Sequence, residues 1–181
     1  FTFNVSEFVP ERMDLTVDLP KDIGLGAKDV TANLDGRYLF GSPAAQNRVS
    51  IRTDYQPTNH FDTKYSDYFV GQAFSISHWR DVESIDDIKL DDQGKYSLTF
   101  PLYKSSLMKS PVNARFTFEL FETGGASVSR SQQRQLWSGK KLAGLKAPQG
   151  DIDSYSSVEF HVALLSVDGK QLEAGKVDYH L

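Results

Sequence analysis

Short runs of alternating apolar and polar residues recur along the chain, and this period of two constrains the fold more than any other feature. In one run, Met13, Leu15, Val17 and Leu19 alternate with charged or polar residues. Such alternation places one face of a strand against a core and the other in water, which is typical of antiparallel sheets. The clearest runs are residues 12–19, 48–55, 95–102, 113–120, 158–164 and 176–181.

No long stretch of the sequence carries a convincing helical period. Residues 81–92 (DVESIDDIKLDD) come nearest, and we expect one helical turn at most, within an acidic and solvated loop. Many short strands without helices predict an all-β fold, specifically an antiparallel β-sandwich of the immunoglobulin or fibronectin-III type.

Glycine and proline mark the expected turns. In YLFGSPAAQNRV, residues 38–49, Gly41 and Pro43 separate two strand-like runs, which predicts a sharp turn in which Gly41 can adopt a positive φ. Asp35-Gly36 allows either a hairpin or one long strand with a bulge at Gly36, and we favour the long strand. Further turns are expected at residues 92–94 and 168–169, the second in a hairpin.

Two features suggest domain boundaries within the 181 residues. Pro10 separates two alternating segments, and the Gly- and Lys-rich stretch 135–150 interrupts the pattern again. We therefore predict an end strand or linker of a preceding domain over residues 1–9, and a complete sandwich over 10–137. Residues 138–181 contain too few strands for a stable sandwich of their own and are expected to be the first part of a second one.

Charge and composition argue against several classes of partner and site. The net charge is −4 with acids and bases interleaved, so we expect neither a nucleic-acid partner nor an anionic membrane surface. The chain has no cysteine, which excludes disulfides, zinc–thiolate sites and cysteine nucleophiles. No apolar run approaches the ~20 residues of a membrane span, so direct insertion is not expected. The first residue, Phe1, opens on an alternating pattern, and we expect that the chain was cut from a longer one.

No set of residues predicts an enzyme, a metal site or a cofactor. The histidines lack H-E-x-x-H spacing; a cross-strand pair of His161 and His180 would need a third ligand, so solvated histidines are favoured. The carboxylates of residues 81–92 lack the spacing of a calcium loop. No G-x-S-x-G nucleophile motif occurs.

The best candidate for a binding site is the aromatic stretch NHFDTKYSDYF, residues 59–69. Its rings could stack on sugars, which would make the chain a carbohydrate- or ligand-binding module of a surface or periplasmic protein. The favoured alternative is that the rings cover one open end of the sandwich. The candidate ligand contacts are Phe61, Tyr65, Tyr68 and Phe69.

Several stretches together resemble the macroglobulin domains of bacterial alpha-2-macroglobulins. FNVSEFVPERMDLTVDL, GRYLFGSPAAQNRVSI and LDDQGKYSLTF occur in the order that the family shows, and FELFETGGASVSR is similar to a closing strand of such a domain. The segment that begins GLKAPQGDIDSYSSVEFHVALL looks like the first half of the next domain. The resemblance therefore covers nearly the whole chain.

The resemblance implies a non-catalytic structural role. The family are large periplasmic chains, often lipoproteins of the inner membrane, that trap proteases after cleavage of a bait region. The expected partners are neighbouring macroglobulin-like domains, with proteases bound by other parts of the parent protein. Many relatives contain a thioester, which this cysteine-free chain cannot carry, and no bait segment is evident. The matched residues are expected to be architectural, among them Phe8, Pro10, Tyr38, Gly41, Pro43 and Gly94.

Overall fold

The fold is all-β in the part of the chain that a computed structural model describes: residues 11–21, 23, 29–60, 65–71, 81–102, 110–136, 141–146, 157 and 159–166. Every strand pairing in it is antiparallel. The strands are β1 (Met13–Asp18), β2 (Asp29–Tyr38), β3 (Arg48–Pro57), β4 (Phe69–Val70), β5 (Asp81–Lys89), β6 (Lys95–Pro101), β7 (Val112–Phe121), β8 (Ser127–Leu136), β9 (Lys141–Lys146) and β10 (His161–Ser166).

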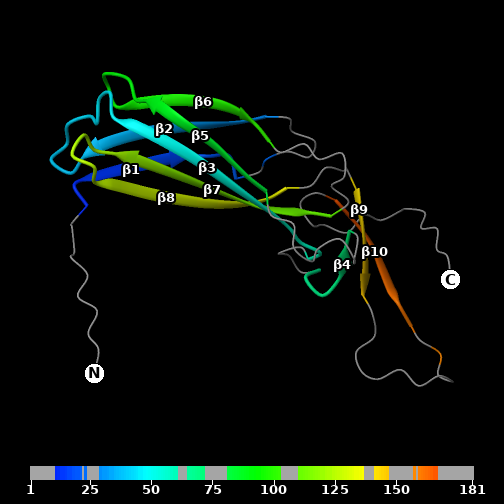
Figure 1. The fold of residues 1–181 in the computed structure, drawn as a ribbon. Helices are drawn as coiled ribbons and strands as arrows, with labels where there is room; N and C mark the ends of the chain where they lie inside the picture. Colours follow the sequence, from blue (N-terminus) through cyan, green and yellow to red (C-terminus); the bar gives the residue numbers. More distant parts are fainter. Residues whose placement is uncertain are drawn as a thin grey trace, which may run out of the picture.

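Two sheets pack face to face and confirm the predicted sandwich. One has the strand order β1-β2-β6 and the other β5-β3-β7-β8. A third sheet, β10-β9-β4, lies at one end of this sandwich, opposite the end that carries the β2–β3 and β7–β8 turns (Figure 1). The runs expected at 12–19, 48–55, 95–102 and 113–120 coincide with β1, β3, β6 and β7. Residues 1–10 and 167–181, including the run expected at 176–181, lie outside the described part.

Alternating residues of both sheets form the core of the sandwich. In β7, Ala114, Phe116, Phe118 and Leu120 are completely buried, and the residues between them face outward. Phe116 lies 5.8 Å from the ring of Phe100 on β6, which joins the two sheets across the core. Burying a side chain of this size contributes roughly 1.5–3 kcal/mol, so the period-two pattern of β7 accounts for much of the stability of the sandwich.

The corner at residues 38–49 is a tight turn held by several contacts. Gly41 has a φ of +98° and donates a backbone hydrogen bond to Tyr38 O, as expected from the Gly-Ser-Pro sequence. The buried Asn47 donates from Nδ2 to the hydroxyl of Tyr38 and lies 3.3 Å from the sulfur of Met13. The corner therefore fastens the start of β3 to both β1 and β2.

Residues 29–38 form the single long strand favoured from the sequence, but its pairing with β1 stays in register through Leu15 and Gly36. The bulge that the structure does contain lies between β3 and β5.

That bulge explains why β5 was missed. Residues 81–89 form a strand rather than the loop with one helical turn expected from their sequence. Ile51 pairs with Ile85 and Val49 pairs with Ile88, so β5 has one more residue than β3 over this interval. Asp87 takes up the extra residue with a φ of +63°. The resulting spacing of the two isoleucines imitates one turn of a helix.

The strand β8 was also missed, because the middle of its inward face is polar. FELFETGGASVSR, residues 118–130, contains the end of β7, a turn and the start of β8, rather than one closing strand. Gln132 donates to Val17 O at 2.8 Å, and Arg134 donates to Leu19 O at 2.9 Å and to Pro20 O at 2.7 Å. These side chains satisfy backbone carbonyls at the free edge of the neighbouring sheet.

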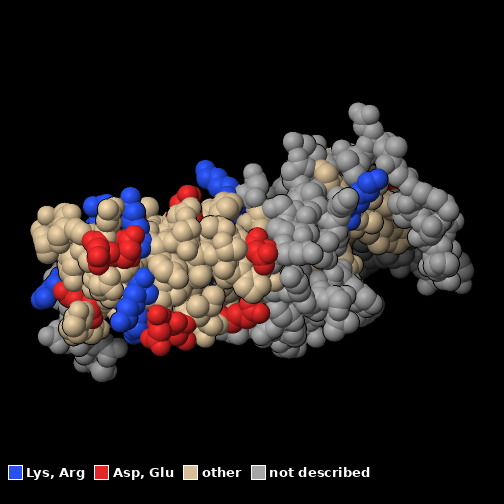
Figure 2. Space-filling view, turned by 90° about the horizontal axis from the view of Figure 1, so that it is seen from above, with Lys and Arg blue, Asp and Glu red and all other residues tan. Residues whose placement is uncertain are grey.

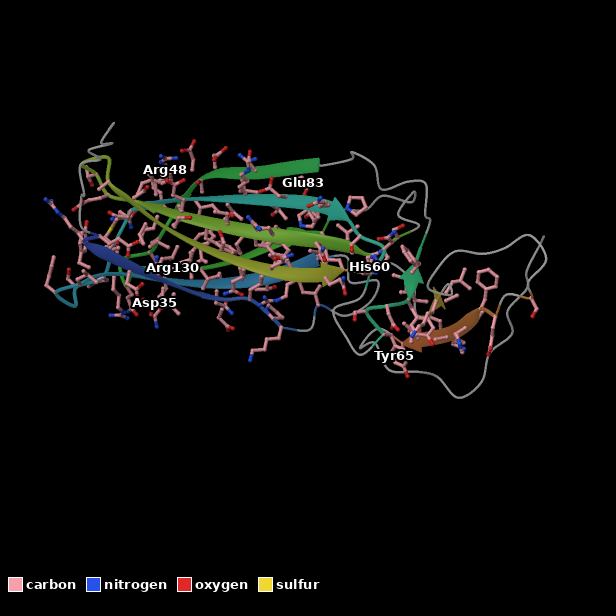
Figure 3. The ribbon with its side chains drawn as sticks, turned by 90° about the horizontal axis from the view of Figure 1, so that it is seen from below. Asp35, Arg48, His60, Tyr65, Glu83 and Arg130 are labelled. Carbon is pink, nitrogen blue, oxygen red and sulfur yellow. The ribbon has the colours of Figure 1, made fainter. Side chains whose placement is uncertain are left out.

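Ion pairs also join β8 to the neighbouring sheet at this edge. Arg130 on β8 forms ion pairs with Asp14, at 2.8 Å, and with Glu11. The hydrogen bonds that Arg130 donates to these carboxylates hold the pKa of Arg130 above its usual value. In Figure 3, Arg130 lies in the half of the sandwich away from the third sheet, at a position along it similar to that of Arg48. Charged and polar side chains that cover a strand edge protect it from pairing with another chain.

Candidate functional site

The predicted aromatic site lies where the sandwich meets the third sheet. After β3 the chain turns through residues 58–60 and returns at 65–71, and Phe61 falls outside the described residues. Val70 donates to Asn59 O, and Gln135 at the end of β8 donates to His60 O, both within 2.9 Å. Figure 3 shows His60 at the junction and Tyr65 beside the third sheet.

Two of the candidate rings belong to a second, smaller core. Tyr65 and Tyr68 meet edge to face, with centroids 5.5 Å apart, and both pack against the buried residues of the third sheet. Tyr68 lies directly over Gly144, where an added Cβ would come within 3.1 Å of the Tyr68 Cβ. The buried members of this small core are Val70, Leu142, Ala163 and Leu165.

Phe69 lies on the opposite face of the third sheet, because neighbouring strand residues point to opposite sides. Its side chain is 48% exposed, and its ring centroid lies 4.9 Å from that of His60. The three candidate rings that the structure describes therefore do not form one platform on which a sugar could stack. The predicted ligand contacts of Phe61, Tyr65, Tyr68 and Phe69 remain a prediction.

An ion pair fastens the aromatic turn to the third sheet. Asp67 contacts Lys146 at the end of β9. The hydrogen bond from Lys146 lowers the pKa of Asp67, and the same bond raises the pKa of Lys146. Both groups are exposed, so water screens the pair and its role is to orient the turn rather than to add much stability.

The described residues contain no group of three or more His, Asp or Glu that could hold a metal ion. His161 lies at the start of β10, 3.9 Å from Glu159, and the predicted partner His180 is outside the described residues. Glu83, Asp86 and Asp87 of β5 are exposed, and Glu83 accepts a hydrogen bond from Tyr55 at 3.4 Å. The described part of the chain contains no helix that is long and apolar enough to cross a membrane.

On the described part of the surface, acidic and basic side chains are interleaved and a cleft opens at one end. Lys and Arg side chains alternate with Asp and Glu side chains over the face in Figure 2. A cleft of about 370 Å³ opens at the far end of the sandwich, between the start of β1 and the β7–β8 turn. Its lining includes the carboxylates Glu11 and Glu122, of which Glu11 is paired with Arg130.

Long bacterial chains have similar sequences. The alpha-2-macroglobulin of Xylella fastidiosa (strain Temecula1) is 29% identical over 174 residues, which cover 94% of this chain and 10% of the relative. The alpha-2-macroglobulin of Escherichia coli K12 is 26% identical over 145 residues, covering 80% of this chain and 9% of the relative. The chain thus spans about a tenth of the length of these curated relatives.

Solved structures have the same fold. E. coli alpha-2-macroglobulin activated by porcine elastase matches with a TM-score of 0.68 at 24% identity, over 90% of this chain and 15% of that one. Salmonella alpha-2-macroglobulin reacted with methylamine matches with a TM-score of 0.65 at 21% identity, over 92% of this chain and 12% of that one. The model of the bacterial alpha-2-macroglobulin MG5 domain matches residues 11–138. The chain therefore belongs to the bacterial alpha-2-macroglobulin family, and this stretch is its MG5 domain.

Proposed function

We propose that the chain is a non-catalytic structural part of a bacterial protease inhibitor of the alpha-2-macroglobulin type, which holds neighbouring domains and scaffolds the bait region. In this proposal, residues 10–137 are one complete macroglobulin-like sandwich and residues 138–181 begin a second. Residues 1–9 end a preceding domain or link to it. The observation that carries the proposal is the match of the MG5 domain over residues 11–138.

The positions of the family motifs support a structural role. Tyr38 accepts a hydrogen bond from Asn47, and Gly41 allows the corner that follows β2. Gly94 sits in the β5–β6 turn, where its carbonyl accepts a hydrogen bond from Gly36. Each of these residues contributes to the course of the backbone at a turn or corner.

The partners and location follow from the same proposal. Neighbouring macroglobulin-like domains of the same polypeptide are the direct partners, and proteases contact other parts of it. The parent polypeptide is periplasmic and is anchored to the inner membrane as a lipoprotein. The interleaved charges of the surface support protein neighbours rather than nucleic acid (Figure 2).

Two measurements test this proposal: detection of the native polypeptide with an antibody, and protease inhibition. An antibody raised against the 181-residue chain should detect a polypeptide well above 100 kDa in the periplasmic or inner-membrane fraction, since the chain spans about a tenth of its relatives. That polypeptide should inhibit several proteases of different specificity, whereas the 181-residue chain alone should inhibit none. A native band near 20 kDa, or strong inhibition by the chain alone, would contradict the proposal.

A second candidate function, binding of a carbohydrate or another ligand, is favoured by the half-exposed ring of Phe69 beside His60. Its test is a glycan array followed by titration with wild type and with Phe69→Ala, Tyr65→Ala and Tyr68→Ala. Phe69→Ala is the sharper variant, because Tyr65 and Tyr68 also pack in the small core and their loss can disturb folding. Binding that a folded Phe69→Ala variant loses supports a ligand site beside His60; absence of any glycan binding removes the carbohydrate candidate.

A further inference from the structure

The third sheet is apolar on both faces. Its inner face carries the small core of Val70, Leu142, Ala163 and Leu165. An antiparallel sheet with only one face packed normally presents polar residues on the other. The outer face of this sheet instead presents a row of apolar side chains to water.

The strand register makes this row continuous. Leu145 in the central strand β9 pairs directly with Phe69 of β4 on one side and with Val162 of β10 on the other. The three side chains are 48%, 44% and 48% exposed in the order Phe69, Leu145, Val162. Facing cross-strand neighbours have their Cβ atoms about 5 Å apart, so the row forms one patch.

The rest of the outer face extends the patch. Ala143 pairs with Leu164 beyond the row, and Phe160, 52% exposed, lies just before β10. Only the end of this face, where Lys141 pairs with Ser166, is polar. A face of this composition resembles half of the interior of a sandwich, which a second sheet would complete.

The size of the patch indicates what kind of occupant covers it. Four half-exposed apolar side chains present about 300–400 Å² of surface, whereas a stable interface between separate proteins buries roughly 800 Å² on each partner. A second copy of the chain would gain too little from this contact alone. A layer tethered in the same polypeptide needs a smaller contact, because its effective concentration is high.

The length of the relatives supplies such a layer. One alignment to the Xylella relative covers 94% of this chain but only 10% of that protein. Most of a polypeptide of that length lies outside the 181 residues and is available to cover the sheet.

We propose that the patch formed by Phe69, Leu145, Phe160 and Val162, here called the outer apolar patch, is covered by a β-sheet layer from elsewhere in the same polypeptide. This inference rests on the proposed function, since it requires a parent chain longer than 181 residues. It also assigns β4, which lies within the MG5 stretch, to the sheet that this layer covers.

Thiol labelling tests the proposal, because the chain itself has no cysteine. Leu145→Cys is made in the 181-residue chain and in the native-length polypeptide, and its reaction with a small maleimide is followed by mass spectrometry of the peptide that contains it. Arg115→Cys is the matched control, since Arg115 is exposed on a polar strand face of the sandwich. In the 181-residue chain both thiols should react at similar rates.

In the native-length polypeptide, Leu145→Cys should react at least about tenfold more slowly than in the short chain, while Arg115→Cys keeps its rate. Equal rates of Leu145→Cys in both proteins would overturn the proposal. Protection of Leu145→Cys in the short chain that increases with protein concentration would also overturn it, and would assign the patch to a second copy.

Protease inhibition by the same native-length variants separates this inference from the proposed function. If the polypeptide inhibits proteases while Leu145→Cys labels freely, the proposed function holds and the covered patch is refuted. If Leu145→Cys is protected but the polypeptide inhibits no protease, the patch is covered and the proposed function is refuted.

Discussion

Gly94 in the β5–β6 turn has both a positive φ and a close backbone neighbour. Comparison with two other glycines allows the energetic effect of each to be measured separately. Gly94 has a φ of +76°, and a Cβ added to it would lie 2.4 Å from the carbonyl oxygen of Gly36. Gly41 has a φ of +98°, but a Cβ there meets nothing within 4 Å. A Cβ added at Gly124 would also meet nothing within 4 Å, and the φ of Gly124 is not positive.

The expected losses of stability differ among the three alanine variants. Gly124→Ala should change the free energy of unfolding by no more than about 0.5 kcal/mol. Gly41→Ala should cost about 1–2 kcal/mol for its left-handed backbone. Gly94→Ala should cost the same amount and in addition about 1–3 kcal/mol for the overpacked contact, since the obstacle is backbone that cannot rotate away. The total for Gly94→Ala is about 2–5 kcal/mol.

The loss at Gly94 also involves a hydrogen bond. Gly36 N donates to Gly94 O at 2.8 Å, and Ala44 N donates to Gly36 O at 2.9 Å. A shift that relieves the added Cβ would stretch these bonds, which join the turn, β2 and the corner.

Urea unfolding of the 181-residue chain, followed by circular dichroism, measures the three variants under identical conditions. The expected order of stability is Gly124→Ala, then Gly41→Ala, then Gly94→Ala. If Gly94→Ala and Gly41→Ala lose the same free energy, close approach to Gly36 does not contribute and the reasoning is wrong.

Three further predictions concern the edge, the core and the ion pair. Arg134→Met should lower the free energy of unfolding by about 2–3 kcal/mol, because Leu19 O and Pro20 O lose their donor; Arg115→Met, on an exposed face, should change it by less than about 0.5 kcal/mol. Phe116→Ala, measured by the same urea unfolding, should cost about 3–5 kcal/mol through the cavity that it leaves. Lys146→Met should raise the pKa of Asp67 in a carboxyl NMR titration, and an unchanged pKa would exclude the ion pair in solution.

The pH dependence of that ion pair follows from the direction of the shift. Because Lys146 lowers the pKa of Asp67 in the folded chain, the stabilisation from this carboxylate is present above the usual pKa of an aspartate. It is lost as the pH falls through the lowered value. Since both groups are exposed, salt should weaken the effect.

The sandwich was predictable because its core strands alternate cleanly. In β7, Phe116 and Phe118 face the interior and their neighbours face outward, and no bulge disturbs the count. The turn at Gly94 and the corner at Gly41 were predictable for a related reason, since only glycine adopts their φ readily.

The strands β5 and β8 were not predicted, because they depend on contacts with other strands rather than on the local sequence pattern. β5 contains an extra residue, so its isoleucines are spaced as on a helix, and only pairing with β3 makes it a strand. The inward side chains of β8 are polar because they extend past the core to carbonyls of the opposite sheet, such as Val17 O. Neither cause can be read without knowing the partner strand.

The aromatic candidates were found by composition, but their arrangement was not predictable. Tyr68 and Phe69 are neighbours in sequence, yet they face opposite sides of a sheet whose central strand comes much later in the chain. The separation between them depends on the pairing of Phe69 with Leu145, which no local signal indicates.

The insertion of β4 beside β9 has a mechanical consequence. The chain passes from β3 to β4, returns from β4 to β5, and passes again from β8 to β9, so three covalent connections join the third sheet to the sandwich. A single linker would let the sheet rotate about its own axis, whereas three covalent connections restrict that rotation. A force applied to β9 would therefore be distributed over the ends of β3, β5 and β8, and the junction would resist rotation rather than act as a hinge.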